Sequence, residues 1–370
     1  MSANTEIQPA HQGKTMGHNE WETFYKADIS TKLHTFSRDG RIYDCLFSQQ
    51  FDRNLLDRLI RLANHMRAIT KVREGDDFLQ SLLAHRRAML YFSQPSTRTF
   101  LSFMSACHIL GIKVLEIRDL KTSSQIKGES FEDTMLTFAS YVDLIIMRHH
   151  VAGLAEKAAW TLNRAHRPVP VVNAGSGADQ HPTQALLDIY TLQRYLPGGI
   201  DGKHIVMVGD LKRGRTVRSL SYLMKNFSDV RLTFAAPEAF RMEPDILEFL
   251  DRHMIHYRQT EEFHSILPDA DAVYMTRIQD EHDTSGESKK VDYSPFYLKG
   301  EHLKTMKPHA LIMHPLPRRE EIATEIDGDP RAVYWRQERN GMWMRTALLA
   351  FVFGLEKTVL DHPAPAGERG

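Results

Sequence analysis

The chain has 370 residues with 47 basic and 47 acidic side chains, so its formal net charge is zero. This length is enough for two domains that each bury a core. Balanced charge without a block of one sign argues against nucleic-acid or membrane-surface partners, and no apolar run approaches the ~20 residues that span a membrane.

The N-terminal segment 1–44 lacks hydrophobic periodicity and is expected to be a flexible extension. Trp21 and Phe24 indicate one amphipathic turn that can dock against the rest of the chain. The segment has no apolar signal core, and the two cysteines, Cys45 and Cys107, show no metal-ligand spacing. A reducing, cytoplasmic location is therefore expected.

The next part of the chain alternates helical and strand patterns. Helical spacing begins near Asp52 and recurs after residue 129 and over 151–164. Short apolar runs predict four strands, at 88–92, 114–117, 142–147 and 169–174. This alternation predicts parallel βαβ units with helices on both faces of one sheet.

The first of these strands runs into a turn that opens a helix. The helix is expected to begin with Ser96, Thr97, Arg98 and Thr99 and to continue to Leu110. Three hydroxyls, one guanidinium and the unpaired N–H groups of a helix start form a site suited to an anion. An ordinary serine N-cap is the alternative, and the arginine inside the turn favours phosphate.

A second alternation follows a long helix that starts at Pro182 and ends before Pro197. Its strands are predicted at 204–209, 230–235, 271–275 and 310–314, with helices near 215–226 and 244–253. We therefore predict an α/β protein of two doubly wound parallel-sheet domains with the active site in the cleft between them. The expected boundaries are 45–185 for the first domain, completed by a C-terminal helix at 341–358, then 186–340 for the second domain and 359–370 for a disordered tail.

Polar residues follow the predicted strands at the ends where α/β sheets bind ligands. They are Ser96–Thr99, Arg148, His181, Gln184, Asp210, Arg215, Arg277, Gln279, His314 and Arg318. A single such arginine is usually a solvated surface charge. Several at successive strand ends, in a chain without net charge, predict a cleft that binds several negative groups.

Seven separated motifs resemble those of the aspartate/ornithine transcarbamylase family, in the family's order and over about residues 45–358. They are Pro95–Thr99, Lys127–Ser130, Met147–His149, His181–Asp188, Met207–Lys212 with Gly214–Val217, Tyr274–Gln279, and His314–Arg318. Ornithine-type members carry a Ser-Met-Gly loop and a late cysteine where this chain has Met275-Thr276-Arg277 and Pro315. The resemblance therefore implies a dicarboxylate acceptor.

The resemblance implies transfer of the carbamoyl group of carbamoyl phosphate to the amine of L-aspartate. The products would be N-carbamoyl-L-aspartate and phosphate, in an early step of de novo pyrimidine biosynthesis. It implies no cofactor and no metal, and the leaving phosphate would accept the amine proton. Such a reaction requires stabilised negative charge on the carbonyl oxygen and on the leaving group.

The resemblance also assigns roles to individual residues. Arg98, Thr99, Arg148 and His181 would be catalytic, and carbamoyl phosphate would be bound by these four with Ser96, Thr97, Gln184, Leu316 and Pro317. Aspartate would be bound by Lys127, Arg215, Arg277 and Gln279. Ser123 and Lys127 would come from a neighbouring subunit, which implies a homotrimer with shared sites. Leu316–Pro317 resembles a cis turn of the family.

Several alternatives stay open at this point. Gly209–Thr216 is one residue from a P-loop, which would need lysine where Arg215 stands. His181 could be a core histidine, and 123–127 a mobile surface loop. Residues 280–290 depart from the Lys-Glu-Arg run that is frequent in the family, which keeps a different acceptor amine open. A non-catalytic subunit is a further alternative, and a separate regulatory or partner chain is compatible with the sequence.

Overall fold

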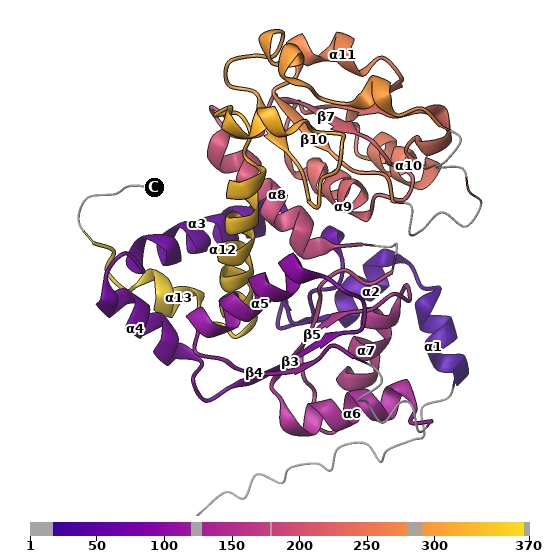
Figure 1. The fold of residues 1–370 in the computed structure, drawn as a ribbon. Helices are drawn as coiled ribbons and strands as arrows, with labels where there is room; N and C mark the ends of the chain where they lie inside the picture. The colour runs from indigo at the N-terminus through magenta and orange to yellow at the C-terminus, as the bar shows by residue number, and fades with distance from the viewer. Residues whose placement is uncertain (1–17, 120–127, 178–179, 280–285, 287–290, 366–370) are drawn as a thin grey trace, which may run out of the picture.

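The computed structural model describes residues 18–119, 128–177, 180–279, 286 and 291–365. Within them the chain forms two α/β domains, each built on a parallel sheet with helices on both faces (Figure 1). This confirms the predicted fold class. None of the described helices is long and apolar enough to cross a membrane.

The first domain is built on a sheet in the order β4-β3-β5-β6, all parallel. Its strands are β3 (Arg87–Phe92), β4 (Lys113–Ile117), β5 (Leu144–Arg148) and β6 (Val171–Asn173). Side chains alternate between the faces of a strand, so Leu90 packs in the core with α3 (Arg53–Ile69) and α5 (Thr97–Ile109), while Met89 packs with α6 (Phe131–Tyr141) and α7 (Leu154–Asn163).

The second domain is built on a parallel sheet in the order β11-β10-β7-β8-β9. Its strands are β7 (His204–Val208), β8 (Arg231–Ala235), β9 (His256–Thr260), β10 (Ala272–Met275) and β11 (Leu311–Met313). The main helices of this domain are α9 (Arg215–Leu223), α10 (Pro244–Arg252) and α11 (Phe263–Ile266).

Two helices, α8 (Pro182–Tyr195) and α12 (Tyr334–Val352), pack against each other and join the domains (Figure 1). The C-terminal helix α12 also packs against α5 and α3, so it is part of the first domain's helical layer. It begins before the predicted residue 341, because Tyr334 is buried against the second domain.

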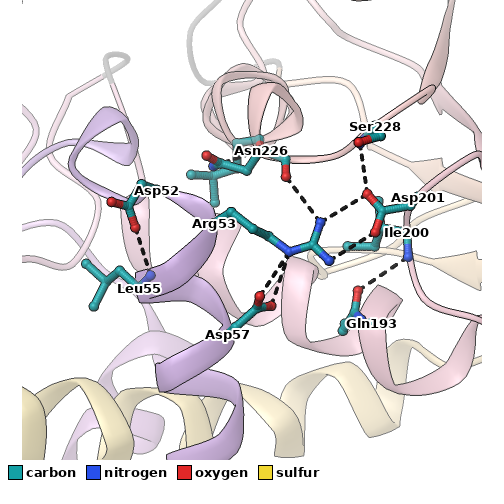
Figure 2. A network of polar contacts seen from close by, with 10 residues as sticks. Asp52, Arg53, Leu55, Asp57, Gln193, Ile200, Asp201, Asn226 and Ser228 are labelled. Carbon is teal, nitrogen blue, oxygen red and sulfur yellow. Dashed lines mark hydrogen bonds and ion pairs between the residues drawn. The ribbon is translucent and has the colours of Figure 1, made fainter.

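A polar network fastens the same two domains near the end of α8 (Figure 2). The guanidinium of Arg53, at the start of α3, donates from both terminal nitrogens to the carboxylate of Asp201, each at 3.0 Å. It also donates to the backbone carbonyl of Asn226 at 3.2 Å, and Asp201 accepts from the N–H of Ser228 at 2.8 Å. The domains are thus held together by polar contacts as well as by the two helices.

The expectation of a flexible extension is wrong for residues 18–44. This part contains α1 (His18–Tyr25), α2 (Ile29–Thr35) and a small hairpin of β1 (Ser37–Arg38) and β2 (Arg41–Ile42). Trp21 is buried with its ring 5.7 Å from that of Trp160 on α7, which supplies the apolar contact that orders the segment. Residues 1–17 lie outside the described residues.

Other differences also have a physical cause. The edge strand β9 is partly exposed and polar, so it shows no apolar run. Helix α4 (Arg73–Leu82) likewise has few buried residues. The tail does not become disordered at 359, because α13 (Glu356–Leu360) continues there and the ring of His362 stacks on Phe78 with centroids 3.9 Å apart.

Candidate active site

A cleft of about 400 Å³ lies at the carboxyl ends of both sheets, where the two domains meet. Asp210 and Arg318, which were predicted from their positions at strand ends, do not line this cleft. All the described residues to which the family resemblance assigns a role do line it. They are Ser96, Thr97, Arg98, Thr99, Arg148, His181, Gln184, Arg215, Arg277, Gln279, Leu316 and Pro317. Ser123 and Lys127 lie outside the described residues. The structure therefore brings together side chains that are far apart in the sequence, from Ser96 to Pro317.

The start of α5 supplies hydroxyls and backbone donors to one end of the cleft. Ser96 is the N-cap residue, yet its side chain makes no capping hydrogen bond with the described helix. The hydroxyl is therefore not used to cap the helix, contrary to the ordinary N-cap alternative. α8 and α9 also begin at this cleft, after His181 and Gly214, so three positive helix ends meet there.

Arg148 and His181 form the buried floor of the cleft. Nη1 of Arg148 donates to the carbonyl of Ala174 at 3.2 Å, while its Nε–H has no acceptor among the described residues. Burial, reinforced by the guanidinium groups of Arg215, Arg345 and Arg98, lowers the pKa of Arg148 well below its ordinary value. A buried guanidinium with an unused donor, surrounded by other guanidinium groups, indicates that the site is built to receive negative charge.

The surroundings of His181 favour the neutral form of its imidazole. Burial, with the positive charges of Arg148, Arg215 and Arg345, lowers the pKa of its imidazole well below 6.5. A neutral imidazole can still donate one N–H to an oxygen in the cleft. Because it carries no charge, it attracts an anion less strongly than the neighbouring guanidinium groups do. This arrangement suits stabilisation of a carbonyl oxygen.

Gln184 is held by a buried carboxyl one turn further along α8. Its Nε2 donates to Asp188 Oδ1 at 3.1 Å. Asp188 also accepts from Tyr274 at 2.8 Å and from Gln337 at 2.7 Å, so it connects α8, β10 and α12. Burial raises the pKa of Asp188 to about 7, although the three hydrogen bonds oppose this shift.

The second domain contributes Arg215, Arg277 and Gln279 to the opposite wall. Arg215 donates to the carbonyls of Gly175 and Gly177, so its side chain also links α9 to the first domain. The terminal nitrogen of Arg277 donates to the carbonyl of Ile278 at 2.9 Å. Both guanidinium groups therefore line the cleft from the second domain.

The turn after β11 closes the cleft from the second domain. The Leu316–Pro317 peptide bond is cis, as predicted, and Leu316 has a φ of 52°. The N–H of Leu316 donates to Nδ1 of His314 at 2.7 Å, and Nε2 of that histidine lies 2.8 Å from a carboxylate oxygen of Glu321. The turn is therefore fixed by its own side chains.

Sequence reasoning did not assign a role to several residues that line the cleft: Gln94, Thr216, Thr276, Glu338 and Arg345. Glu338 and Arg345 both belong to α12. The sequence signal was a charged residue, Arg345, inside a mainly apolar helix. This arginine is 2% exposed, and its guanidinium donates to Ser102 at 2.7 Å. A buried arginine seldom occurs without a ligand or an ion partner.

Two family models match the chain. The aspartate/ornithine carbamoyltransferase carbamoyl-P binding domain matches residues 44–194, and the Asp/Orn binding domain of the same family matches residues 201–352. These two matches correspond to the two domains on either side of the cleft.

Similar proteins and structures carry related names. The chain is 42% identical over 310 residues to a chloroplastic aspartate carbamoyltransferase of Arabidopsis thaliana, covering 83% of this chain and 76% of that protein. It is 40% identical over 277 residues to an aspartate carbamoyltransferase catalytic subunit of Parabacteroides distasonis, covering 75% and 88%. A crystal structure of aspartate transcarbamoylase from Trypanosoma cruzi with carbamoyl phosphate and aspartate is 35% identical, with a TM-score of 0.75 and coverage of 85% and 97%.

Proposed function

Because this chain belongs to the aspartate/ornithine carbamoyltransferase family, we propose that its cleft transfers the carbamoyl group of carbamoyl phosphate to the amine of L-aspartate. The observation that carries this proposal is the meeting of Arg98, Arg148 and His181 with Arg277 in one cleft. The first three suit a phosphate and a carbonyl oxygen. The fourth adds positive charge for a carboxylate on the facing wall.

In the proposed reaction the amine nitrogen of aspartate attacks the carbonyl carbon of carbamoyl phosphate. A C–N bond forms, the C–O bond to phosphate breaks, and the leaving phosphate takes the amine proton. Ser96, Thr97, Arg98 and Thr99 would hold the phosphate, which also meets the positive end of α5.

The carbonyl oxygen would be stabilised by Thr99, Arg148 and neutral His181. Gln184, oriented by Asp188, would contact the carbamoyl NH₂ together with the carbonyls of the turn at Leu316 and Pro317. Donors fixed in advance need little reorganisation as charge develops, and removing one commonly costs ~10²–10³ in rate. Holding two substrates face to face contributes up to about 7–11 kcal/mol.

L-Aspartate is proposed as the acceptor because Arg215, Arg277 and Gln279 would bind its carboxylates. Lys127, which lies outside the described residues, would be a further binding residue. Two guanidinium groups on one wall match an acceptor with two carboxylates. L-Ornithine, which carries a second amine instead of a second carboxylate, would place positive charge beside them.

The proposal is tested by incubating purified protein with carbamoyl phosphate and a panel of amines: L-aspartate, L-ornithine, L-glutamate and L-asparagine. We expect ureido product with L-aspartate and little with the others. Product with ornithine instead, or no carbamoyl transfer to any amine, would reject the proposed acceptor or the proposed activity. Arg98→Ala serves as the active-site control, with turnover reduced by at least ~10²-fold.

We further propose a homotrimer with shared sites and a cytoplasmic location for a step of de novo pyrimidine biosynthesis. The family motif at Lys127 supports shared sites. Two free, buried cysteines, Cys45 and Cys107, support a reducing compartment. Because the Arabidopsis relative is named as chloroplastic, microscopy of the fluorescently tagged full chain is the test, and signal confined to an organelle would reject the location.

A further inference from the structure

The cleft contains an acidic side chain, Glu338, to which the proposed chemistry assigns no role. Five arginines line it: Arg98, Arg148, Arg215, Arg277 and Arg345. Among the described residues that line the cleft, Glu338 is the one acid. A carboxylate in a site that receives phosphate is unfavourable for binding, because like charges repel in a poorly solvated environment. Its presence therefore requires a physical explanation.

Glu338 faces the phosphate-binding arginine. Its Oε1 lies 3.6 Å from Nε of Arg98, and its side chain is 27% exposed. Arg345 lies seven residues further along α12, on the same side of the helix, and is buried. Burial raises the pKa of Glu338, while the charges of Arg345 and Arg98 act in the opposite direction. The carboxylate thus pairs with Arg98 and is also influenced by the positive charge of Arg345.

We propose that Glu338 is an internal counter-ion of the phosphate site, which pairs with Arg98 in the empty cleft and competes with bound phosphate for that guanidinium. This inference rests on the proposed function. It assigns Glu338 no bond-making step. Its effect is to weaken binding of the phosphate group and to speed release of product phosphate.

Five guanidinium groups and three helix ends would retain inorganic phosphate after the carbamoyl group has left. Binding that is equally strong for substrate and product does not raise kcat. A nearby carboxylate lowers the affinity for any phosphate that contacts Arg98, and affinity changes of this kind appear mainly in the dissociation rate.

A purely structural role makes the opposite prediction. If Glu338 only oriented Arg98, its loss would leave the guanidinium misplaced and phosphate would bind more weakly. If Glu338 competes with phosphate, its neutralisation leaves Arg98 available and phosphate binds more tightly. The sign of the change in phosphate affinity therefore separates the two roles.

The experiment is titration calorimetry of inorganic phosphate into the full-length wild type, Glu338→Gln and Glu338→Ala. We expect both variants to bind phosphate at least ~10-fold more tightly, from removal of one nearby like charge. Steady-state assays should show a lower KM for carbamoyl phosphate, stronger product inhibition by phosphate and an unchanged or lower kcat. Glu338→Asp, which keeps the charge, should remain within about threefold of wild type.

The matched control is Glu248→Gln, the same charge change at an exposed position on α10, which should leave phosphate affinity unchanged. Unchanged or weaker phosphate binding in both neutral variants, each with a wild-type unfolding temperature, would overturn the inference. Carbamoyl transfer to L-aspartate by the wild type is measured in the same preparation. Its absence would reject the proposed function, whereas a wrong sign with an active wild type would reject only the role of Glu338.

Discussion

Gly175 lies between two side chains that are expected to hold the carbonyl oxygen. Its φ is 100°, and a β-carbon there would lie 2.7 Å from Cδ2 of His181 and 2.8 Å from Nη1 of Arg148. Real β-carbons do not approach other atoms so closely. The residue is therefore a glycine because both the backbone conformation and the space require it.

We predict that Gly175→Ala lowers kcat/KM by ~10²–10³, because displacing preorganised donors costs about as much as removing one. Gly198→Ala is the control, since Gly198 also has a positive φ of 77° but a β-carbon there would meet no other atom within 4 Å. That variant should keep wild-type kinetics. Steady-state assays with carbamoyl phosphate and aspartate measure both, and normal kcat/KM in Gly175→Ala would contradict the packing argument.

Asp188 provides a prediction about pH. Burial raises the pKa of Asp188 from 3.8 to about 7. Between these two pH values the folded state therefore keeps a proton that the unfolded state has released. The stability that this carboxyl contributes is complete below about pH 4 and is lost as the pH rises to about 7. Burial also raises the pKa of Asp44 to about 7. Because Asp44 is unchanged in Asp188→Asn, its contribution to the pH dependence is the same in this variant and in the wild type.

We predict that Asp188→Asn becomes more stable relative to wild type as pH rises from 5 to 8, by roughly 2–3 kcal/mol. The asparagine cannot ionise, so this part of the pH dependence disappears. Chemical unfolding of both proteins at the two pH values measures the difference. If the two proteins showed the same pH dependence, Asp188 would not be the group responsible.

Among the secondary-structure elements, α1 docks on α7 and so turns the N-terminal segment into part of the first domain. Trp21 is 8% exposed and contacts Trp160 and Phe24. We predict that Trp21→Ala lowers the free energy of unfolding by about 3 kcal/mol, the usual cost of deleting a buried aromatic ring. It should leave the KM for aspartate unchanged, because α1 does not line the cleft.

The control for Trp21→Ala is Tyr141→Ala at the end of α6, where the side chain is 65% exposed. This substitution should change the unfolding free energy by no more than about 0.5 kcal/mol. Equal stability of the two variants in chemical denaturation would show that α1 does not contribute to the folded core.

Strands with a continuous apolar run were predictable, and the polar edge strand β9 was not. β5 and β7 are buried along their whole length, so their apolar runs are continuous. β9 reads His-Tyr-Arg-Gln-Thr and pairs on one side with β8, so its partly exposed residues lack that pattern. The helix starts after Ser96 and at Pro182 were predictable for a local reason, because the change from strand to helical periodicity and the preference of proline for the first helical turn are both set by neighbouring residues.

In the molecule as a whole, the cleft exists because α8 and α12 and the contact of Arg53 with Asp201 hold two sheets with their carboxyl ends facing it. Substrates that are bound by the two domains can then come into contact. The family motif at Lys127 implies that a neighbouring subunit also contributes a side chain to the cleft. The proposed active site therefore depends on the assembly of a trimer.

We predict that Arg98→Ala and Lys127→Ala proteins, each with activity reduced by at least ~10²-fold, regain activity when they are unfolded together and refolded as a mixture. In random trimers of a 1:1 mixture, about a quarter of shared sites would carry neither change. Each variant refolded alone is the control. A mixture no more active than its components would show that the sites are not shared.

The amino-acid sequence by itself determined the α/β class, the strand–turn–helix at Ser96–Thr99 and which polar residues follow strand ends. These features depend on neighbours within a few residues and on the rule that parallel strands end at one edge. Only the tertiary structure decided that Asp188 orients Gln184, that Trp21 docks on Trp160, and that α12 places Glu338 beside Arg98. The last two of these contacts join segments that are far apart in the chain, and local periodicity carries no information about which distant side chains packing will bring together.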